Sequence, residues 1–224
     1  MIVLVGVGHV FDLQRSIRAE IQRRAPKVVA LELDPLRYDA LIHGAIPGPR
    51  PSIFGLFAQF QSRIAQAYGV HVGDEMVAAA RAAQERGIEV ALIDRDSRLT
   101  LQRAWGQMPF EERVRLVVSA LASLFVRPRR VEAELDRFYQ DEDAYIREFA
   151  NEMSTIKRVM IDERDAQMAE SLKRLHASKG EVVAIVGDGH VEGIGRLLAG
   201  WPVETVRLQD LRGAAATPDS TGTG

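Results

Sequence analysis

The sequence contains no cysteine among its 224 residues. Disulfide bonds and thiolate metal sites are therefore excluded, and any metal ion must be bound by histidine, aspartate or glutamate. The net charge is only −2 and there is no long basic block, which argues against nucleic acid as a main partner. A hydrophobic content of 46% is enough for one sizeable core in a chain of this length.

Long apolar runs are also missing. The longest, residues 116–126, is interrupted by two serines and is shorter than the roughly 20 residues needed to cross a bilayer. Met1 leads directly into an apolar strand pattern with no basic region before it, so we expect no signal peptide and a cytoplasmic location. Residues 213–224 are small and polar and are predicted to form a disordered tail.

Short runs rich in Val and Ile are apolar without alternation, which is typical of buried strands. They cover residues 2–5, 28–33, 89–93 and 182–186, with a fifth expected at 203–208. Helical patterns at 12–24 and 74–86 lie between them. This alternation predicts an α/β fold with a mostly parallel central sheet flanked by helices.

The region between the third and fourth strands breaks this pattern. Residues 98–178 hold only helical patterns, at 99–107, 110–125, 129–137, 142–150 and 154–177. We predict a helical insertion there within a single domain over residues 1–212. The segment 44–56 contains three prolines and three glycines and is a candidate lid over a site.

Two similar glycine-rich turns follow the first and fourth strands. Gly6-Val7-Gly8-His9 comes after one, and Gly187-Asp188-Gly189-His190 after the other. A lone histidine in such a turn is more often structural, and the likeness could be coincidence. Ligands of open α/β sheets bind at the carboxyl ends of strands, so the repetition favours one site containing His9 and His190.

Charged residues at other strand ends point to the same edge. Glu32 ends the second strand, where a glutamate needs a partner or a function, and Asp94 and Arg95 follow the third. Arg164 lies in the apolar stripe of a helix predicted over residues 154–177. It must either meet an anion there or extend to the edge of the stripe. Glu75 begins a helix, where an acid is favourable without any further role.

Several motifs in order give the sequence a resemblance to a known family. They are Gly6 to His9, Glu32 to Tyr38, Gly73 to Met76, Ile93 to Asp96, Thr100 to Arg103, Glu163 to Asp165, and Gly187 to His190 with Gly193 and Ile194. With these motifs the chain resembles the TraB/PrgY family, related to the Tiki proteins, within a group of folds that includes erythromycin esterase and ChaN. The resemblance covers about residues 1–200.

The resemblance implies an α/β fold with His9, His190 and Glu32 in one site. It also implies a metal-dependent hydrolase of the peptidase class, and it gives added weight to Glu75, Arg37 and Arg164. Some family members carry a C-terminal membrane segment where this sequence has a polar tail. Others are linked to pheromone shutdown, which binding without cleavage would also achieve.

The leading hypothesis is therefore metal-assisted hydrolysis of a peptide. His9, His190 and a carboxylate, Glu32 or Glu75, would bind Mn²⁺, Co²⁺ or Zn²⁺, since mixed nitrogen and oxygen ligands suit all three ions. The second carboxylate would be the general base. Arg95 or Arg164 would stabilise the oxyanion or bind a substrate carboxylate.

Two other classes compete with hydrolysis. The same residues could anchor a peptide, a pheromone or a small molecule without turnover. A dinucleotide site is suggested by Gly6 and Gly8 after a strand, but Phe11 stands where a third glycine is needed. The helical insertion also offers apolar surface for a homodimer.

Overall fold

The computed structural model describes residues 1–8, 13–44, 73–123 and 153–216. His9, most of the proposed lid and two helices expected at 129–137 and 142–150 lie outside the described residues. No helix among the described residues is both long enough and apolar enough to cross a membrane.

Five parallel strands form the central sheet, as the sequence predicts. They are β1 (Ile2–Val7), β2 (Val28–Leu31), β3 (Glu89–Leu92), β4 (Val182–Gly187) and β5 (Val203–Val206). Their spatial order is β3-β2-β4-β1-β5. Val7 of β1 pairs with Gly187 of β4, so these neighbouring strands end level with each other.

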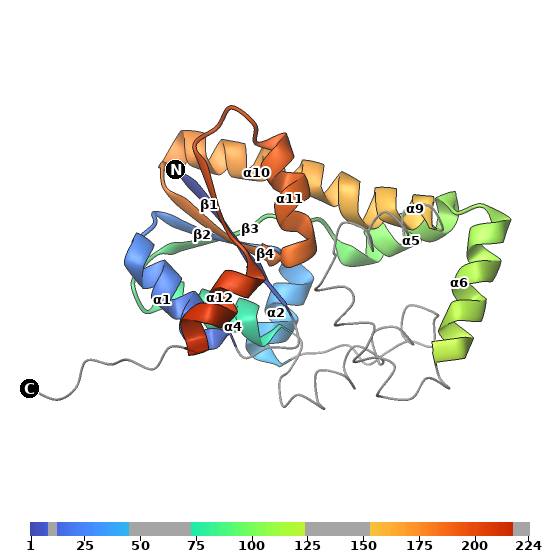
Figure 1. The fold of residues 1–224 in the computed structure, drawn as a ribbon, viewed down its shortest axis with the longest axis horizontal. Helices are drawn as coiled ribbons and strands as arrows, with labels where there is room; N and C mark the ends of the chain where they lie inside the picture. Colours follow the sequence, from blue (N-terminus) through green and yellow to red (C-terminus); the bar gives the residue numbers. More distant parts are fainter. Residues whose placement is uncertain (9–12, 45–72, 124–152, 217–224) are drawn as a thin grey trace, which may run out of the picture.

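Helices cover both faces of the sheet (Figure 1). On one face lie α1 (Gln14–Arg24), α4 (Asp74–Gln84) and α12 (Leu208–Ala216); on the other lie α10 (Glu163–Lys179) and α11 (Asp188–Leu197). Strand β1 shows why the strands are unbroken apolar runs in the sequence. Val3 and Val5 pack against the face covered by α1, α4 and α12, whereas Ile2 and Leu4 pack against the face covered by α10 and α11.

Helix α2 (Pro35–His43) was not predicted from the sequence. It begins at a capping residue, Asp34, whose carboxylate accepts the Arg37 backbone N–H at 2.9 Å. Proline follows at the first helical position, where its missing N–H costs nothing. Asp34 also accepts the Ser97 N–H at 3.2 Å, which ties α2 to the segment that follows β3.

The described part of the region between β3 and β4 is helical. It comprises α5 (Ser97–Gln107), α6 (Phe110–Ser123), α9 (Ser154–Lys157) and a π-helical turn, η1 (Arg158–Asp162), that continues into α10. A small separate core, which includes Ala104, Met108 and Val159, holds these helices together. Where one helix is expected over 154–177, the structure thus has a continuous helical rod with a π turn inside it.

At the C-terminal side, α12 continues to Ala216. It passes Gly213, where the sequence predicts the tail to begin. The division into one domain over 1–212 and a tail stays a prediction.

Candidate functional site

Four elements bring charged side chains to the carboxyl edge of the sheet. Glu32 directly follows β2, Asp94 lies two residues after β3, and His190 is in the first turn of α11 after β4. Helix α10 leads into β4 and so runs antiparallel to it, which places Arg164 and Asp165 at the same edge. The strand-end convergence expected from the sequence is therefore present for the residues that the structure describes.

Arg164 lies at the centre of this group. Its Nε and Nη2 donate to the two oxygens of Asp94 at 3.1 and 2.7 Å, and its Nη2 also donates to Glu32 Oε1. Its Nη1 lies 3.1 Å from the Met160 carbonyl oxygen and 3.1 Å from His190 Nε2. A guanidinium has five N–H donors, and each has a partner here. The Arg164 side chain, which is 13% exposed, therefore meets carboxylates and does not extend into solvent.

His190 is oriented by Asp165. The distance from His190 Nδ1 to Asp165 Oδ1 is 2.6 Å, and both side chains are buried. With its Nδ1 proton held by Asp165, the neutral ring presents its Nε2 lone pair to the group around Arg164. Nε2 also lies 3.4 Å from Glu32 Oε1, so a protonated Nε2 has a carboxylate within reach.

The ionisation of His190 reflects these two carboxylates. Burial lowers the pKa of the imidazole, but Glu32 and Asp165 outweigh that effect and raise the pKa above its ordinary value. Burial also raises the pKa of the Asp165 carboxyl, in spite of the hydrogen bond with His190. The pair is thus arranged to keep a proton between them.

Glu32 is held in its charged form. Burial raises the pKa of its carboxyl, but His190, Arg164 and the Gly187 N–H together lower it below the ordinary value. The Gly187 N–H donates to Glu32 Oε2 at 2.6 Å. Glu32 therefore has one oxygen fixed by the end of β4 and the other turned toward Arg164 and His190.

A second ionic group adjoins the first. Arg95 Nη1 donates to Glu163 Oε2 at 3.1 Å, and Arg95 Nη2 donates to the Val159 carbonyl at 2.5 Å. Glu163 also accepts from Arg103 and Arg158. The sequence predicts Arg95 beside the two histidines. Its backbone N–H donates to Asp94 Oδ1 at 2.9 Å, while its side chain contacts Glu163 and Val159 in this neighbouring group.

Two other residues to which the resemblance gives weight lie at the same edge. Arg37, on α2, approaches Asp94 with an Nη1–Oδ2 distance of 3.8 Å. Glu75 is buried in the first turn of α4, and α4 leads into β3, so its start faces the carboxyl edge of the sheet. The catalytic role of Glu75 stays a prediction, as does the part of His9, which lies outside the described residues.

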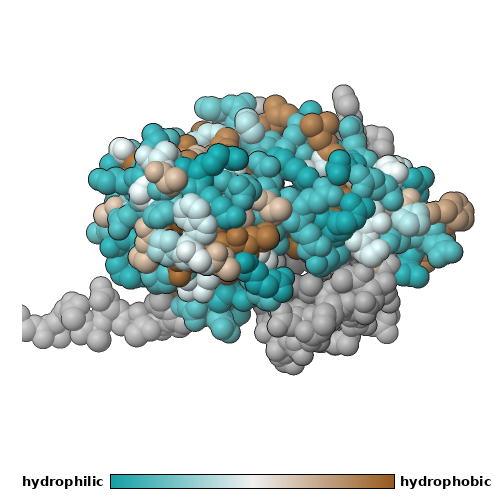
Figure 2. All heavy atoms as spheres, turned by 90° about the horizontal axis from the view of Figure 1, so that it is seen from above, coloured by the Kyte–Doolittle hydropathy of each residue, from teal (hydrophilic) through white to brown (hydrophobic). Residues whose placement is uncertain are grey.

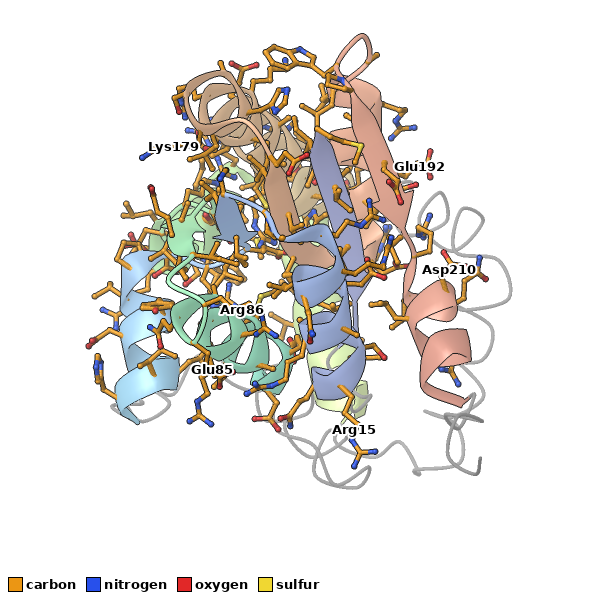
Figure 3. All side chains as sticks on the ribbon, turned by 90° about the vertical axis from the view of Figure 1, so that its left-hand side faces the viewer. Arg15, Glu85, Arg86, Lys179, Glu192 and Asp210 are labelled. Carbon is orange, nitrogen blue, oxygen red and sulfur yellow. The ribbon has the colours of Figure 1, made fainter. Side chains whose placement is uncertain are left out.

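Of the two glycine-rich turns, the structure describes in full the one that follows β4. Strand β4 passes directly into α11, so His190 is helical, and the likeness with the turn that holds His9 stays a prediction. The arginines that follow each histidine by six positions are exposed: Arg196 pairs with Glu192 at 3.0 Å, and Arg15 projects from α1 elsewhere on the surface (Figure 3).

Asp165 is the residue whose importance the sequence reasoning missed. It occupies the apolar face of α10 together with Met168 and Leu172, at positions i, i+3 and i+7, and is buried like them. A carboxylate on a buried helical stripe needs a partner. The same argument that singled out Arg164 would have found it.

The donor set can be compared with the expected divalent metal. Among the described residues, no three histidine, aspartate or glutamate side chains gather so as to hold an ion. His190 Nε2 and Glu32 Oε1 do form a pair 3.4 Å apart, of the nitrogen and oxygen types that Mn²⁺, Co²⁺ and Zn²⁺ accept. Both atoms contact Arg164. These two atoms therefore suit a divalent cation as ligands, and a third protein ligand would have to come from outside this pair.

Together these features define an α/β protein with a buried histidine, carboxylate and arginine site at the carboxyl edge of a parallel sheet. The chain belongs to the TraB/PrgY/gumN family, whose model matches residues 1–200. It is also 31% identical over 210 residues to the uncharacterized protein MJ1365 of Methanocaldococcus jannaschii. The match covers 88% of this chain and 53% of that relative, so the chain spans about half the relative's length.

Proposed function

We propose that this protein is a divalent-metal-dependent hydrolase that acts on peptides. The observation that carries the proposal is the placement of His190, whose Nδ1 is 2.6 Å from Asp165 and whose Nε2 is 3.4 Å from Glu32 Oε1. A metal-binding histidine ordinarily donates its other N–H to a carboxylate, which fixes the ring and raises its basicity. His190 has this arrangement.

In the proposed site, His190 Nε2 and Glu32 Oε1 hold the cation together with His9. Val7 and Gly187 are paired at the ends of β1 and β4, so the chain leaves the sheet toward His9 next to the strand that leads to His190. Arg164 would give up its contacts with His190 and Glu32 and keep Asp94, which it meets through two hydrogen bonds. Asp94 thus gives the displaced guanidinium a partner.

The chain's own residues then have separate roles. When bound, the cation supplies Lewis acidity that lowers the pKa of a water molecule and polarises a carbonyl group. Glu75, the remaining predicted carboxylate, would serve as the general base. Arg164 places positive charge where an oxyanion develops. Asp165 keeps the Nδ1 proton of His190 throughout.

A binding protein without turnover is the second candidate, and one observation favours it. Arg164 already compensates the charge of Glu32 and contacts His190 with all five donors used. Such a site needs no cation to be electrostatically satisfied. A peptide or small ligand would then be sequestered by the same residues.

We also propose that the helical region forms a homodimer contact. Phe110, Val114 and Val118 are exposed at i, i+4 and i+8 on α6, and Phe110 is 79% exposed. Figure 2 shows hydrophobic atoms projecting at the end of the molecule where α6 lies, with hydrophilic atoms around them. Phe110→Ser/Val118→Ser should shift a dimer toward monomer in light scattering; an unchanged mass would contradict the contact.

Metal content is the test of the main proposal. Wild type, His190→Ala and the surface variant Arg23→Ala would be purified without chelator, incubated with Mn²⁺, Co²⁺ or Zn²⁺, desalted and analysed for metal. We expect about one equivalent in wild type and Arg23→Ala, little in His190→Ala, and peptide hydrolysis that follows metal content. Wild type that binds none of the three ions, but binds peptides without cleaving them, would exclude the hydrolase and favour the binding protein.

A further inference from the structure

Glu163 is shared by three arginines. Its Oε2 accepts from Arg95 Nη1 at 3.1 Å and from Arg103 Nε at 3.0 Å, and its Oε1 accepts from Arg158 Nη1 at 3.0 Å. We call these four residues the Glu163 cluster. One carboxylate neutralises one guanidinium, so the cluster keeps two formal positive charges. Like charges held this closely repel each other and favour an additional anion.

A second observation points to a missing partner in the same place. The Nε of Arg95 is buried and has no hydrogen-bond partner among the described residues. Its Nη1 and Nη2 are both engaged, by Glu163 and by the Val159 carbonyl. A buried donor left unpaired costs about 1–3 kcal/mol, and buried donors without partners are uncommon in native proteins.

The π turn gives the cluster its geometry. In η1 the Glu163 N–H bonds to the Arg158 carbonyl five residues earlier, so side chains five apart face the same way. This brings Arg158 close to Glu163, and the Val159 carbonyl of the same turn accepts from Arg95. π turns inside helices are frequent at functional sites.

The cluster adjoins the proposed catalytic site through consecutive residues. Arg95 follows Asp94, and Glu163 precedes Arg164, so one chain step on each side separates the two groups. The side chains of Arg103 and Arg158 are about half exposed, at 54% and 49%. A ligand in solution can therefore reach the cluster while another part of it lies at His190.

We propose that Arg95, Arg103 and Arg158 bind a carboxylate of the substrate beside the catalytic site. The carboxylate of Glu163 already shows the fit, because guanidinium groups bind this planar anion through paired hydrogen bonds. The inference rests on the proposed function and adds that the preferred peptides carry a free α-carboxylate. A side-chain carboxylate offers the same chemistry, and the test separates the two sources.

The experiment compares three probes that differ only in charge and its position. They are N-acetyl-tetraalanine with a free C-terminus, its C-terminal amide, and an amidated peptide of the same length that contains one glutamate. Binding at low salt would be followed through the arginine Nε–H signals in NMR spectra. We expect the free acid to bind about tenfold more tightly than the amide, as about 1.4 kcal/mol of charge-assisted bonding predicts, with the glutamate peptide between them.

Variants assign that preference to the cluster. Arg103→Ala/Arg158→Ala should bind acid and amide equally, whereas Arg23→Ala, which removes an exposed arginine paired with Glu20 on α1, should keep the preference. Equal binding of acid and amide by wild type, or no binding below about 10 mM, would overturn the proposal. So would a double variant that is less stable yet keeps the preference, since the cluster would then be structural.

The same probes separate this inference from the proposed function. His190→Ala should lose metal and hydrolysis but keep the preference for the free acid, because the Glu163 cluster is intact. Loss of hydrolysis with the preference intact therefore concerns only the catalytic site. Normal metal binding and cleavage with no preference between acid and amide would reject only the carboxylate site.

Discussion

The carboxylate of Asp165 occupies the space where a side chain at Gly193 would stand. An ideal Cβ built on Gly193 would lie 1.9 Å from Asp165 Oδ2, far inside any contact distance. Helix α11 thus carries a glycine so that the acid on α10 can reach over it to His190. The orientation of the imidazole depends on this close approach of two helices.

Gly193→Ala should therefore destabilise the protein, by about 1–3 kcal/mol for an overpacked contact, and displace Asp165 from His190. Gly195 is the matched control, because it lies in the same helix and a Cβ there would meet nothing within 4 Å. Gly195→Ala should be neutral or stabilising by up to about 1 kcal/mol. Urea unfolding of the two variants measures the difference, and equal stabilities would contradict the packing.

Loss of the Arg164 guanidinium should lower the stability of the protein more than the Gly193 substitution does. Arg164→Met leaves the buried carboxylates of Glu32 and Asp94 without their cation, at an expected cost of about 3–5 kcal/mol in the free energy of unfolding. Arg23→Met, at an exposed site, should change stability by less than about 0.5 kcal/mol. Adding Asp94→Asn to Arg164→Met should recover part of the loss; no recovery would mean that charge is not the cause.

Asp165 should act on metal binding through His190. Asp165→Asn removes the negative charge that fixes the ring, and such changes typically lower metal affinity by about 10–100-fold. Asp162→Asn is a control three residues earlier in the same rod, at a carboxylate that is 44% exposed and pairs with Lys157. Titration with Zn²⁺ against a competing chelator measures both. Equal affinities in the two variants would remove Asp165 from the site.

The Glu163 cluster predicts a pH dependence of stability. Burial raises the pKa of the Glu163 carboxyl, but hydrogen bonds from Arg95 and Arg103 outweigh it and lower the pKa below the ordinary 4.5. A lowered carboxyl pKa adds stability that is fully present above the unfolded value and is lost as pH falls through the folded value. Wild type should exceed Glu163→Gln in stability at about pH 7, and the gap should close by about pH 3. A stability difference between the two proteins that stays constant from about pH 7 to about pH 3 would contradict a lowered pKa at Glu163.

Some of the fold and the site could be predicted because simple spacing rules decide them. Unbroken Val and Ile runs are buried on both faces of a parallel sheet, and the strand ends carry Glu32 and His190 to one edge. Arg164 was found because a charge interrupts an apolar helical stripe. Asp165 lies on that same stripe, and the rule that found Arg164 applies to it equally, but it was noted only as part of a family motif.

Other features have no signature of this kind. Helix α2 is short and has no fully buried residue, so its periodicity is weak, although Asp34 and Pro35 mark its start. The π turn depends on hydrogen bonds to carbonyls five residues back, which no residue pattern encodes. That turn brings Arg158 to Glu163, so the ionic group next to Asp94 and Arg95 could not be predicted from the sequence.

The π turn at Arg158–Asp162 amounts to one extra residue in an otherwise regular rod. Deleting one of residues 159–162 would return this continuous helix to α-helical spacing with little change in the relative phase of α9 and α10, because the wide turn absorbs the extra residue. Arg164 and Asp165 would keep their places against the sheet. A gain or loss of one codon could therefore change which groups of the turn face Arg95, leaving the arrangement around His190 and the sheet beneath unchanged.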